Sequence, residues 1–170
     1  TLKIIYNSLI LCHLTYGILV WGTKTKAIFT MQKKSIRLIT NSKYNAHTDP
    51  LFKENRLLKI ADIRKIQELS FFFKFKNRTL PEYFLNNFIV HSRSTRLSNM
   101  LIIPRFRHEY YRENLKYTIA ITVNNTPINI ISKADTHSLK GYITYIKKSV
   151  LDNYPDVCNI HRCHICNRQG

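Results

Sequence analysis

Residues 62–76 read Asp62-Ile-Arg-Lys-Ile-Gln-Glu-Leu-Ser-Phe-Phe-Phe-Lys-Phe-Lys76, and this stretch decides the expected fold class. Its apolar residues recur every three or four positions, which is the spacing of one face of an α-helix. Aromatic residues beside cations can also stack bases, but the run 71–76 is interpreted as core. The predicted buried face comprises Ile63, Ile66, Leu69 and Phe73, with Phe72 alongside.

Other segments have helical patterns too, so the sequence predicts a mainly α fold, a compact helical bundle. A first helix is expected over roughly Leu2 to Val20, and because it is apolar on most faces, other helices are expected to surround it. Residues 110–123 are left open between helix and strand, because alternating apolar positions follow a helix-favouring segment. A last helix ends before Pro155, and its predicted apolar stripe comprises Leu139, Tyr142, Ile143, Ile146 and Val150.

The segment 26–40 is expected to be a helix with an apolar side and a cationic side. The cationic side carries Lys33, Lys34 and Arg37. In an isolated helix such a face is simply solvated, but in a chain this basic it also suits phosphate groups. The predicted apolar stripe comprises Ile28, Met31, Ser35 and Leu38, flanked by Ile36 and Ile39.

The charge balance indicates a polyanionic partner. The chain contains 27 Lys and Arg against 10 Asp and Glu, a formal net charge of +17 at pH 7. Nucleic acid (RNA, DNA or a hybrid duplex) is the expected partner, because each neutralised phosphate releases condensed counterions. The alternatives are a solvated basic surface and an anionic membrane, although no short polybasic block favours the membrane. A membrane span over residues 4–21 is a minority interpretation, weakened by the polar residues within that run.

Residues 91–107 place arginines among Ser, Thr and Pro, which predicts an irregular, Arg-rich arm. The guanidinium group presents a planar fork of donors that matches the oxygens of a phosphate. The candidate nucleic-acid contacts of this arm are Arg93, Arg96, Arg105 and Arg107.

No pattern in the sequence indicates a catalytic centre. Two-metal phosphoryl transfer needs carboxylates close together, yet no two of the five aspartates are adjacent. A Gly-rich phosphate loop and a Gly-x-Ser-x-Gly elbow are both missing. We therefore expect no enzymatic activity from this chain alone.

The tail Cys158-Asn-Ile-His161-Arg-Cys163-His164-Ile-Cys166 is the one dense cluster of possible metal ligands. Zn²⁺ prefers thiolate and imidazole ligands, so Cys158, His161, Cys163 and Cys166 are candidates for a zinc site. The single residue between the inner pair is short for a zinc finger. Cys163 and Cys166 could instead begin a knuckle completed beyond residue 170, and a flexible tail with exposed thiols is the simplest alternative.

The cysteines also bear on the cellular compartment. Three of the four crowd into the last thirteen residues, unlike the disulfide framework of a secreted domain. Cys12 lies in an apolar run and is expected to be a buried free thiol. A reducing, intracellular location, nuclear or cytoplasmic, is therefore expected.

Several motifs in order along the chain resemble the region that follows the catalytic palm in reverse transcriptases of Jockey and CR1-like LINE retrotransposons, over about two-thirds of the chain. These motifs are Ile5-Tyr-Asn-Ser-Leu-Ile-Leu11, His13-Leu-Thr-Tyr-Gly-Ile-Leu-Val-Trp-Gly22, Gln32-Lys-Lys-Ser-Ile-Arg-Leu-Ile-Thr40, Ala46-His-Thr-Asp-Pro-Leu-Phe52, Leu80-Pro-Glu-Tyr-Phe84, Ser94-Thr-Arg96 and Pro104-Arg-Phe-Arg107. Where similar sequences usually have Trp-Asn-x-Leu-Pro, this chain has Val123-Asn-Asn-Thr-Pro127, so it departs from the family there.

The resemblance implies a thumb-like helical region that grips the template–primer duplex, with the catalytic aspartates in a preceding palm. It implies that Lys33, Lys34 and Arg37 contact the nucleic-acid backbone. Because the first residue is Thr1 and not Met, we expect a fragment whose partners include the upstream palm and fingers. The implied divisions are a thumb-like region at 1–90, a divergent post-thumb region at 91–155 and the Cys/His tail at 156–170.

Two hypotheses about function follow. The first is a non-catalytic C-terminal part of a retrotransposon RNA-directed DNA polymerase, which binds template–primer nucleic acid through its basic helical surface. The alternative is a zinc-stabilised module for nucleic-acid or protein interaction, derived from a retroelement.

Overall fold

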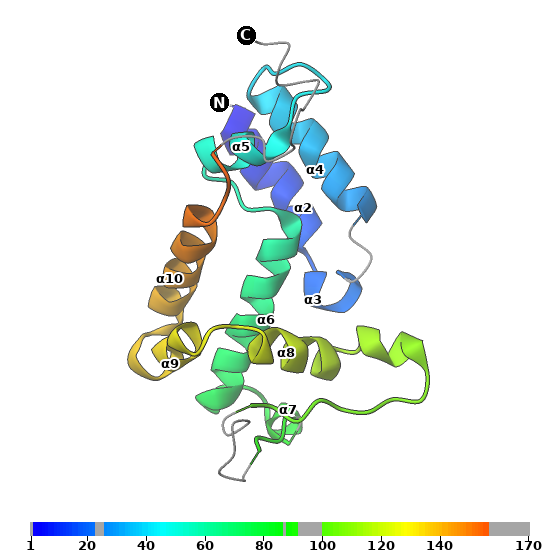
Figure 1. Ribbon diagram of the computed structural model, residues 1–170, viewed down its shortest axis with the longest axis vertical. Coiled ribbons are helices and arrows are strands. Elements are labelled where there is room, and N and C mark those ends of the chain that lie inside the picture. Colours follow the sequence, from blue (N-terminus) through cyan, green and yellow to red (C-terminus); the bar gives the residue numbers. More distant parts are fainter. Residues whose placement is uncertain (1, 23–25, 87, 92–99, 157–170) are drawn as a thin grey trace. The chain divides into compact units, whose positions relative to one another are not determined.

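The computed structural model describes residues 2–22, 26–86, 88–91 and 100–156 (Figure 1). Within these ranges the chain is mainly helical, and its one extended pairing is an isolated antiparallel bridge between Val90 and Leu101. The predicted mainly α fold class is confirmed. The chain divides into two compact units: unit 1 takes residues 1–64 and 147–170, and unit 2 takes residues 65–146.

Unit 1 combines short N-terminal helices with one long helix, and Figure 1 shows that long helix, α4, beside the N-terminal segment. The first part of α6 (Ile60–Lys76) and the end of α10 (Leu139–Asp152) also belong to this unit. The other elements are α1 Leu2–Ile5, the π-helix η1 Tyr6–Leu11, α2 Cys12–Thr15, α3 Ile18–Trp21, α4 Lys26–Ile39 and α5 Thr48–Glu54.

The N-terminal apolar run is interrupted at Tyr16 and Gly17, so the single helix expected over residues 2–20 does not form. Tyr16 is extended, and Gly17 has φ +62°, a left-handed conformation that side chains disfavour. Trp21 Nε1 then donates a hydrogen bond of 2.6 Å to the Tyr16 carbonyl. Gly22 is also required by packing, because a Cβ atom there would lie 2.2 Å from the Ile18 carbonyl oxygen.

The expectation that the N-terminal segment is buried on most faces is wrong. Leu2, Ile4, Leu9 and Val20 are exposed. Cys12, expected to be a buried thiol, is exposed as well. The cause is that α4 and α5 cover only the side of the segment that carries Tyr6 and Leu11. Because the run is apolar on all sides, its hydrophobic periodicity could not predict which side would be buried. In the described part of the chain, no helix has both the length and the hydrophobicity of a membrane span.

The side chain of Gln32 is completely buried in unit 1. Its Nε2 donates to the Tyr6 hydroxyl and to the Leu58 carbonyl, both at 2.9 Å, and its Oε1 accepts from the Ile60 N–H at 2.9 Å. One amide therefore satisfies polar groups from η1, from the residues before α6 and from α6 itself. The apolar cluster of the unit comprises Tyr6, Ile36, Phe52, Leu57 and Tyr154.

The apolar stripe predicted for α4 is wrong. Met31 is 58% exposed and Leu38 is 75% exposed, whereas Gln32 and Ile36 are buried. Phe29 and Ile39 pack partly buried against the same cluster, so the buried face runs through positions 29, 32, 36 and 39. The prediction failed because periodicity counts apolar residues, and here a hydrogen-bonded Gln occupies a core position.

Tyr154 attaches the residues after α10 to unit 1. Its buried hydroxyl donates to the Asp62 carboxylate and accepts from the Lys59 N–H at 3.0 Å. Burial, followed by the hydrogen bond with Asp62, raises the pKa of Tyr154 well above its usual range, so the phenol stays neutral. These contacts make the C-terminal part of α10 and Tyr154 part of unit 1. The boundary expected near residue 90 falls inside unit 2.

Unit 2 contains helices from three parts of the chain: most of α6, the helices between residues 82 and 136, and the start of α10. Figure 1 shows α8 crossing α6, where the Thr122 hydroxyl donates to the Glu68 carboxylate. Residues 110–123, left open from the sequence, are helical, and α9 was not anticipated. Besides the rest of α6 and the start of α10, the elements are α7 Glu82–Leu85, the 3₁₀-helix η2 Glu109–Glu113, α8 Leu115–Asn124 and α9 Ile128–Thr136.

The buried faces predicted for α6 and α10 are largely confirmed in unit 2. Along α6, Ile66, Leu69, Phe72 and Phe73 are buried, which supports the interpretation of the aromatic run as core. Phe73 stacks on Tyr142 of α10 with ring centroids 5.2 Å apart. The Tyr142 hydroxyl is buried and has no hydrogen-bond partner among the described residues.

Replacing Gln32 by Leu should strongly destabilise the protein. The substitution leaves the buried Ile60 N–H and the partly buried Leu58 carbonyl without partners, at a cost of up to about 1–3 kcal/mol each. We expect the free energy of unfolding, measured in urea, to fall by roughly 2–5 kcal/mol. Met31→Leu, on the exposed side of the same helix, is the control and should change stability by less than about 0.5 kcal/mol. Equal stability of Gln32→Leu and the wild type would contradict the role assigned to this amide.

Replacing Tyr142 by Phe should leave stability at pH 7 unchanged or higher, because it removes a buried hydroxyl that lacks a partner. Burial raises the pKa of Tyr142 from 10.0 to about 12. The unfolded chain therefore ionises first, and stability that is fully present below pH 10 is lost as the pH rises toward 12.

The Tyr142→Phe variant should accordingly lose less stability at alkaline pH. Urea midpoints measured between about pH 8 and pH 11.5 would show this as a flatter decline. Tyr83→Phe, at an exposed position, should keep the wild-type decline. A steeper decline in Tyr142→Phe would refute the assignment.

Candidate nucleic-acid interface

Two long spans of the sequence contain no acidic residue. Residues 1–48 include seven Lys and Arg, and residues 83–108 include four Arg, with no Asp or Glu in either span. The cations of these spans that lie nearest to an acidic residue are Arg107 and Arg105, which precede Glu109 by two and four positions. Ion pairs between positions far apart in the sequence connect Lys53 to Asp156 at 2.8 Å, Lys59 to Asp49 at 2.8 Å and Lys76 to Asp135 at 2.6 Å.

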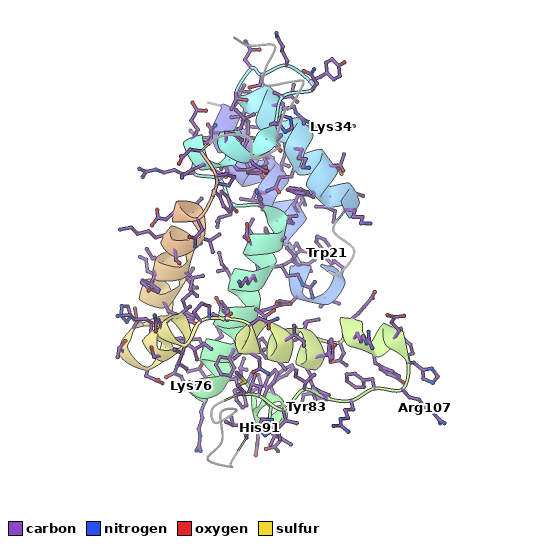
Figure 2. All side chains as sticks on the ribbon, in the orientation of Figure 1. Trp21, Lys34, Lys76, Tyr83, His91 and Arg107 are labelled. Atoms are coloured by element: carbon purple, nitrogen blue, oxygen red, sulfur yellow. The ribbon has the colours of Figure 1, made fainter. Side chains whose placement is uncertain are left out.

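The three predicted contacts on α4 differ in their surroundings. Lys34 is exposed and points away from the ribbon (Figure 2). The Lys33 ammonium lies 4.4 Å from the centroid of the Phe29 ring, a cation–π contact that holds the half-buried side chain. Arg37 Nε donates 2.9 Å to the Ala46 carbonyl, so this side chain braces the loop after α4. Lys34 is thus the most available of the three.

The described part of the Arg-rich arm, residues 100–107, is fixed at its start from two sides. The bridge between Val90 and Leu101 holds one side. On the other side, Asn124 Oδ1 accepts from the Leu101 N–H and Asn124 Nδ2 donates to the Leu101 carbonyl, both at 2.9 Å. The Leu101 side chain is buried. Residues 102–107 form neither helix nor strand, as expected for this part of the arm.

Beyond Leu101 the arm carries Arg105 and Arg107 into solvent. Both side chains are exposed, and neither makes an ion pair with a described residue. Figure 2 shows Arg107 on the outside of the loop that leads to η2. Two of the four predicted contacts of the arm are therefore placed where an external phosphate can reach them.

These arginines were predicted from the sequence, whereas the aromatic side chains around them were not. Phe106 stacks on Tyr111 with centroids 5.4 Å apart and an interplanar angle of 24°, and Tyr110 lies 4.0 Å from Tyr111. The available signal was the mixture of rings and cations between Arg105 and Arg112, which resembles the run at 71–76. We call the whole group the ring cluster, and its members are Phe106, His108, Tyr110, Tyr111 and Tyr117.

Tyr110 of the ring cluster remains a neutral phenol at physiological pH. The side-chain hydrogen bond with Tyr111 raises the pKa of Tyr110 above its ordinary value. Neutral phenol rings bring no negative charge to a surface that faces a polyanion. The ring cluster is thus electrostatically compatible with nucleic acid.

An open groove of about 810 Å³ lies beside the ring cluster. Phe106 and Tyr117 belong both to the cluster and to the groove wall. Arg105 and Arg112 also line the groove, and of these Arg105 makes no ion pair with a described residue, so the groove combines apolar ring surface with a donor available to phosphate. The remaining lining residues are His91, Met100, Leu101, Ile102, Ile103, Pro104, Asn124 and Asn125.

The other predicted site residues lie outside the described residues. They are Arg93 and Arg96 of the arm and the possible zinc ligands Cys158, His161, Cys163 and Cys166. Within the described ranges, no group of three or more His, Cys, Asp and Glu side chains is arranged to hold a metal ion.

No family model, curated protein or solved structure matches this chain. Function is therefore inferred from the residues and their geometry.

Replacing Asn124 by Ala should release the start of the arm. The Leu101 N–H and carbonyl lose their partners, which costs about 1–3 kcal/mol locally. Limited trypsin digestion should then cut faster after Arg105 and Arg107, as mapped by mass spectrometry. Asn125→Ala, at the adjacent exposed position, should keep the wild-type cleavage rate. Identical rates in the two variants would show that Asn124 does not position the arm.

Proposed function

We propose that this chain is a non-catalytic C-terminal part of a LINE-type reverse transcriptase and binds the backbone of template–primer nucleic acid. The resemblance of its motifs to the region after the palm supports this proposal. The net charge of +17 and the two acid-free spans support it independently of that resemblance. In this proposal, a preceding palm carries out phosphoryl transfer, and the present chain binds the template–primer nucleic acid.

The observation that carries the proposal is the placement of Arg105 and Arg107. Both are exposed in an acid-free span, on an arm whose start is fixed by Asn124. A cation already paired with a carboxylate gains little from a phosphate, whereas a solvated guanidinium can form a bidentate contact and release counterions. The arm therefore offers unpaired donors in a defined place.

The helix α4 supplies the second set of proposed contacts, in the other unit. Lys34 is the most accessible of these. The side chain of Lys33 is held by the Phe29 ring and that of Arg37 by the Ala46 carbonyl. Side chains that are already ordered lose less conformational entropy when they bind a phosphate. Arg93 and Arg96 complete the proposed set.

Replacing Arg105 and Arg107 together by Gln should weaken binding to an RNA–DNA hybrid duplex and reduce its dependence on salt. Each lost phosphate contact lowers the slope of log K against log salt by about 0.9 for a duplex. We therefore expect the slope of the double variant to be shallower by roughly 1–2. The measurement is fluorescence anisotropy of a labelled duplex in about 50 to 200 mM salt.

The matched control is Lys53→Gln with Lys76→Gln, which removes the same charge from side chains that already pair with Asp156 and Asp135. This control should retain most of the wild-type slope. Lys34→Gln tests α4 in the same assay and should lower the slope by up to about 0.9. The proposed function would be overturned if the wild type did not bind the duplex, or if its affinity did not change with the salt concentration.

A further inference from the structure

We infer that the ring cluster is a stacking site for unpaired bases, so that unit 2 binds single-stranded nucleic acid next to the duplex. The inference rests on the proposed function and adds the class of ligand. It is carried by the ring geometry, the exposure of the rings and the cations placed between them.

The rings are prearranged and reach solvent: Phe106 stacks on Tyr111, and Tyr110 lies tilted against Tyr111. Tyr110 is 65% exposed, Tyr111 is 38% exposed and Phe106 is 37% exposed. The ring centroids of Tyr110 and Tyr111 lie 4.0 Å apart, and those of Phe106 and Tyr111 lie 5.4 Å apart. The rings therefore contact one another in the absence of a ligand. Contiguous exposed aromatic surface is uncommon on a monomer and marks a binding surface.

Helix α8 supports the ring cluster. Phe106 contacts Tyr117 on α8, with centroids 6.1 Å apart. Asn114 begins α8 by accepting a hydrogen bond of 2.9 Å from the Lys116 N–H, which fixes the junction between η2 and α8. The opposite end of the same helix carries Asn124, which holds the arm at Leu101. One helix thus positions both the tyrosines and the arginines.

The charges around the rings favour a polyanion. Arg105 and Arg107 flank Phe106 in sequence, and Arg112 lines the adjacent groove. Of the nearby acids, Glu109 pairs with Arg112 at 3.5 Å, and Glu113 makes an interaction of its own. Residues 105–116 contain four cations against these two acids, so the surface stays positive.

An exposed ring stack distinguishes single strands from duplexes. In a duplex each base is already stacked between its neighbours, so a protein ring can stack only on a base that is unpaired or at an end. Proteins that hold single strands combine aromatic platforms with a cationic groove for the backbone. Here the groove of about 810 Å³ provides Arg105, which makes no ion pair with a described residue, beside Phe106. The ring cluster and the groove together therefore suit an unpaired segment with its phosphates.

The test uses the full chain and a labelled single-stranded oligonucleotide of about 12 uridines, a length in the range bound by single-strand modules. Tyr110→Leu and Phe106→Leu should each weaken its binding by about 5- to 150-fold, the effect expected from the loss of one base stack. Their affinity for a blunt hybrid duplex, and the salt slopes for both ligands, should remain as in the wild type. Tyr44→Leu, a 90% exposed tyrosine in unit 1, is the matched control and should bind like the wild type.

A second readout locates the contact. An oligonucleotide containing 5-iodouracil, irradiated in complex with the wild type, should crosslink to Tyr110, Tyr111 or Phe106, as mapped by mass spectrometry. Urea denaturation of each variant verifies that it is folded. Tyr110 is largely exposed, so Tyr110→Leu should leave the free energy of unfolding nearly unchanged, and Phe106→Leu, at a partly covered position, should remain folded.

The outcomes separate the two proposals. Duplex binding with the expected salt slope, combined with ring variants that bind the single strand as the wild type does, would overturn the stacking site and leave the proposed function standing. Failure to bind either nucleic acid would overturn both. Tighter binding to phosphatidylserine vesicles than to the oligonucleotide, lost in the ring variants, would assign the surface to an anionic membrane and also refute the stacking site.

Discussion

The side chain of Gln32 supplies hydrogen bonds to three segments of unit 1 whose polar groups would otherwise be unpaired in the core. An unpaired buried donor or acceptor costs far more than an ordinary hydrogen bond contributes, so α4 must present this amide inward. That requirement sets the rotation of the helix. It turns Leu38 toward solvent and leaves Lys34 exposed. The same polar constraint in the core therefore determines which cations face outward.

The positions of the helices along the sequence were largely predictable, whereas the side that each helix buries was less predictable. The apolar period of α6 and α10 correctly identified Ile66, Leu69 and Tyr142 as core, because those helices bury apolar residues on one side. On α4 the apolar period predicted the wrong face, because it counts apolar residues and cannot predict that a glutamine is buried in the core. In residues 2–20 it failed for the opposite reason. A segment that is apolar all round carries no information about which side a neighbour will cover.

The candidate site was half predictable. Composition indicated Arg105 and Arg107, because arginines among Ser, Thr and Pro favour an exposed irregular segment. The rings beside them were missed, since local sequence does not distinguish a buried aromatic from an exposed one. Their exposure depends on how the arm is held, and it is held by Asn124, a residue distant in sequence.

The acid-free spans make the stability of the folded chain sensitive to its ionic surroundings. Residues 1–48 bring like charges together when unit 1 becomes compact, and this mutual repulsion raises the free energy of the native state. An anion that binds the folded form more tightly than the unfolded form offsets that repulsion, and at a concentration of 100 times its Kd it stabilises the fold by about 2.7 kcal/mol. Heparin, polyphosphate or RNA would then act as folding ligands. Melting temperatures of this protein are comparable only at matched anion content.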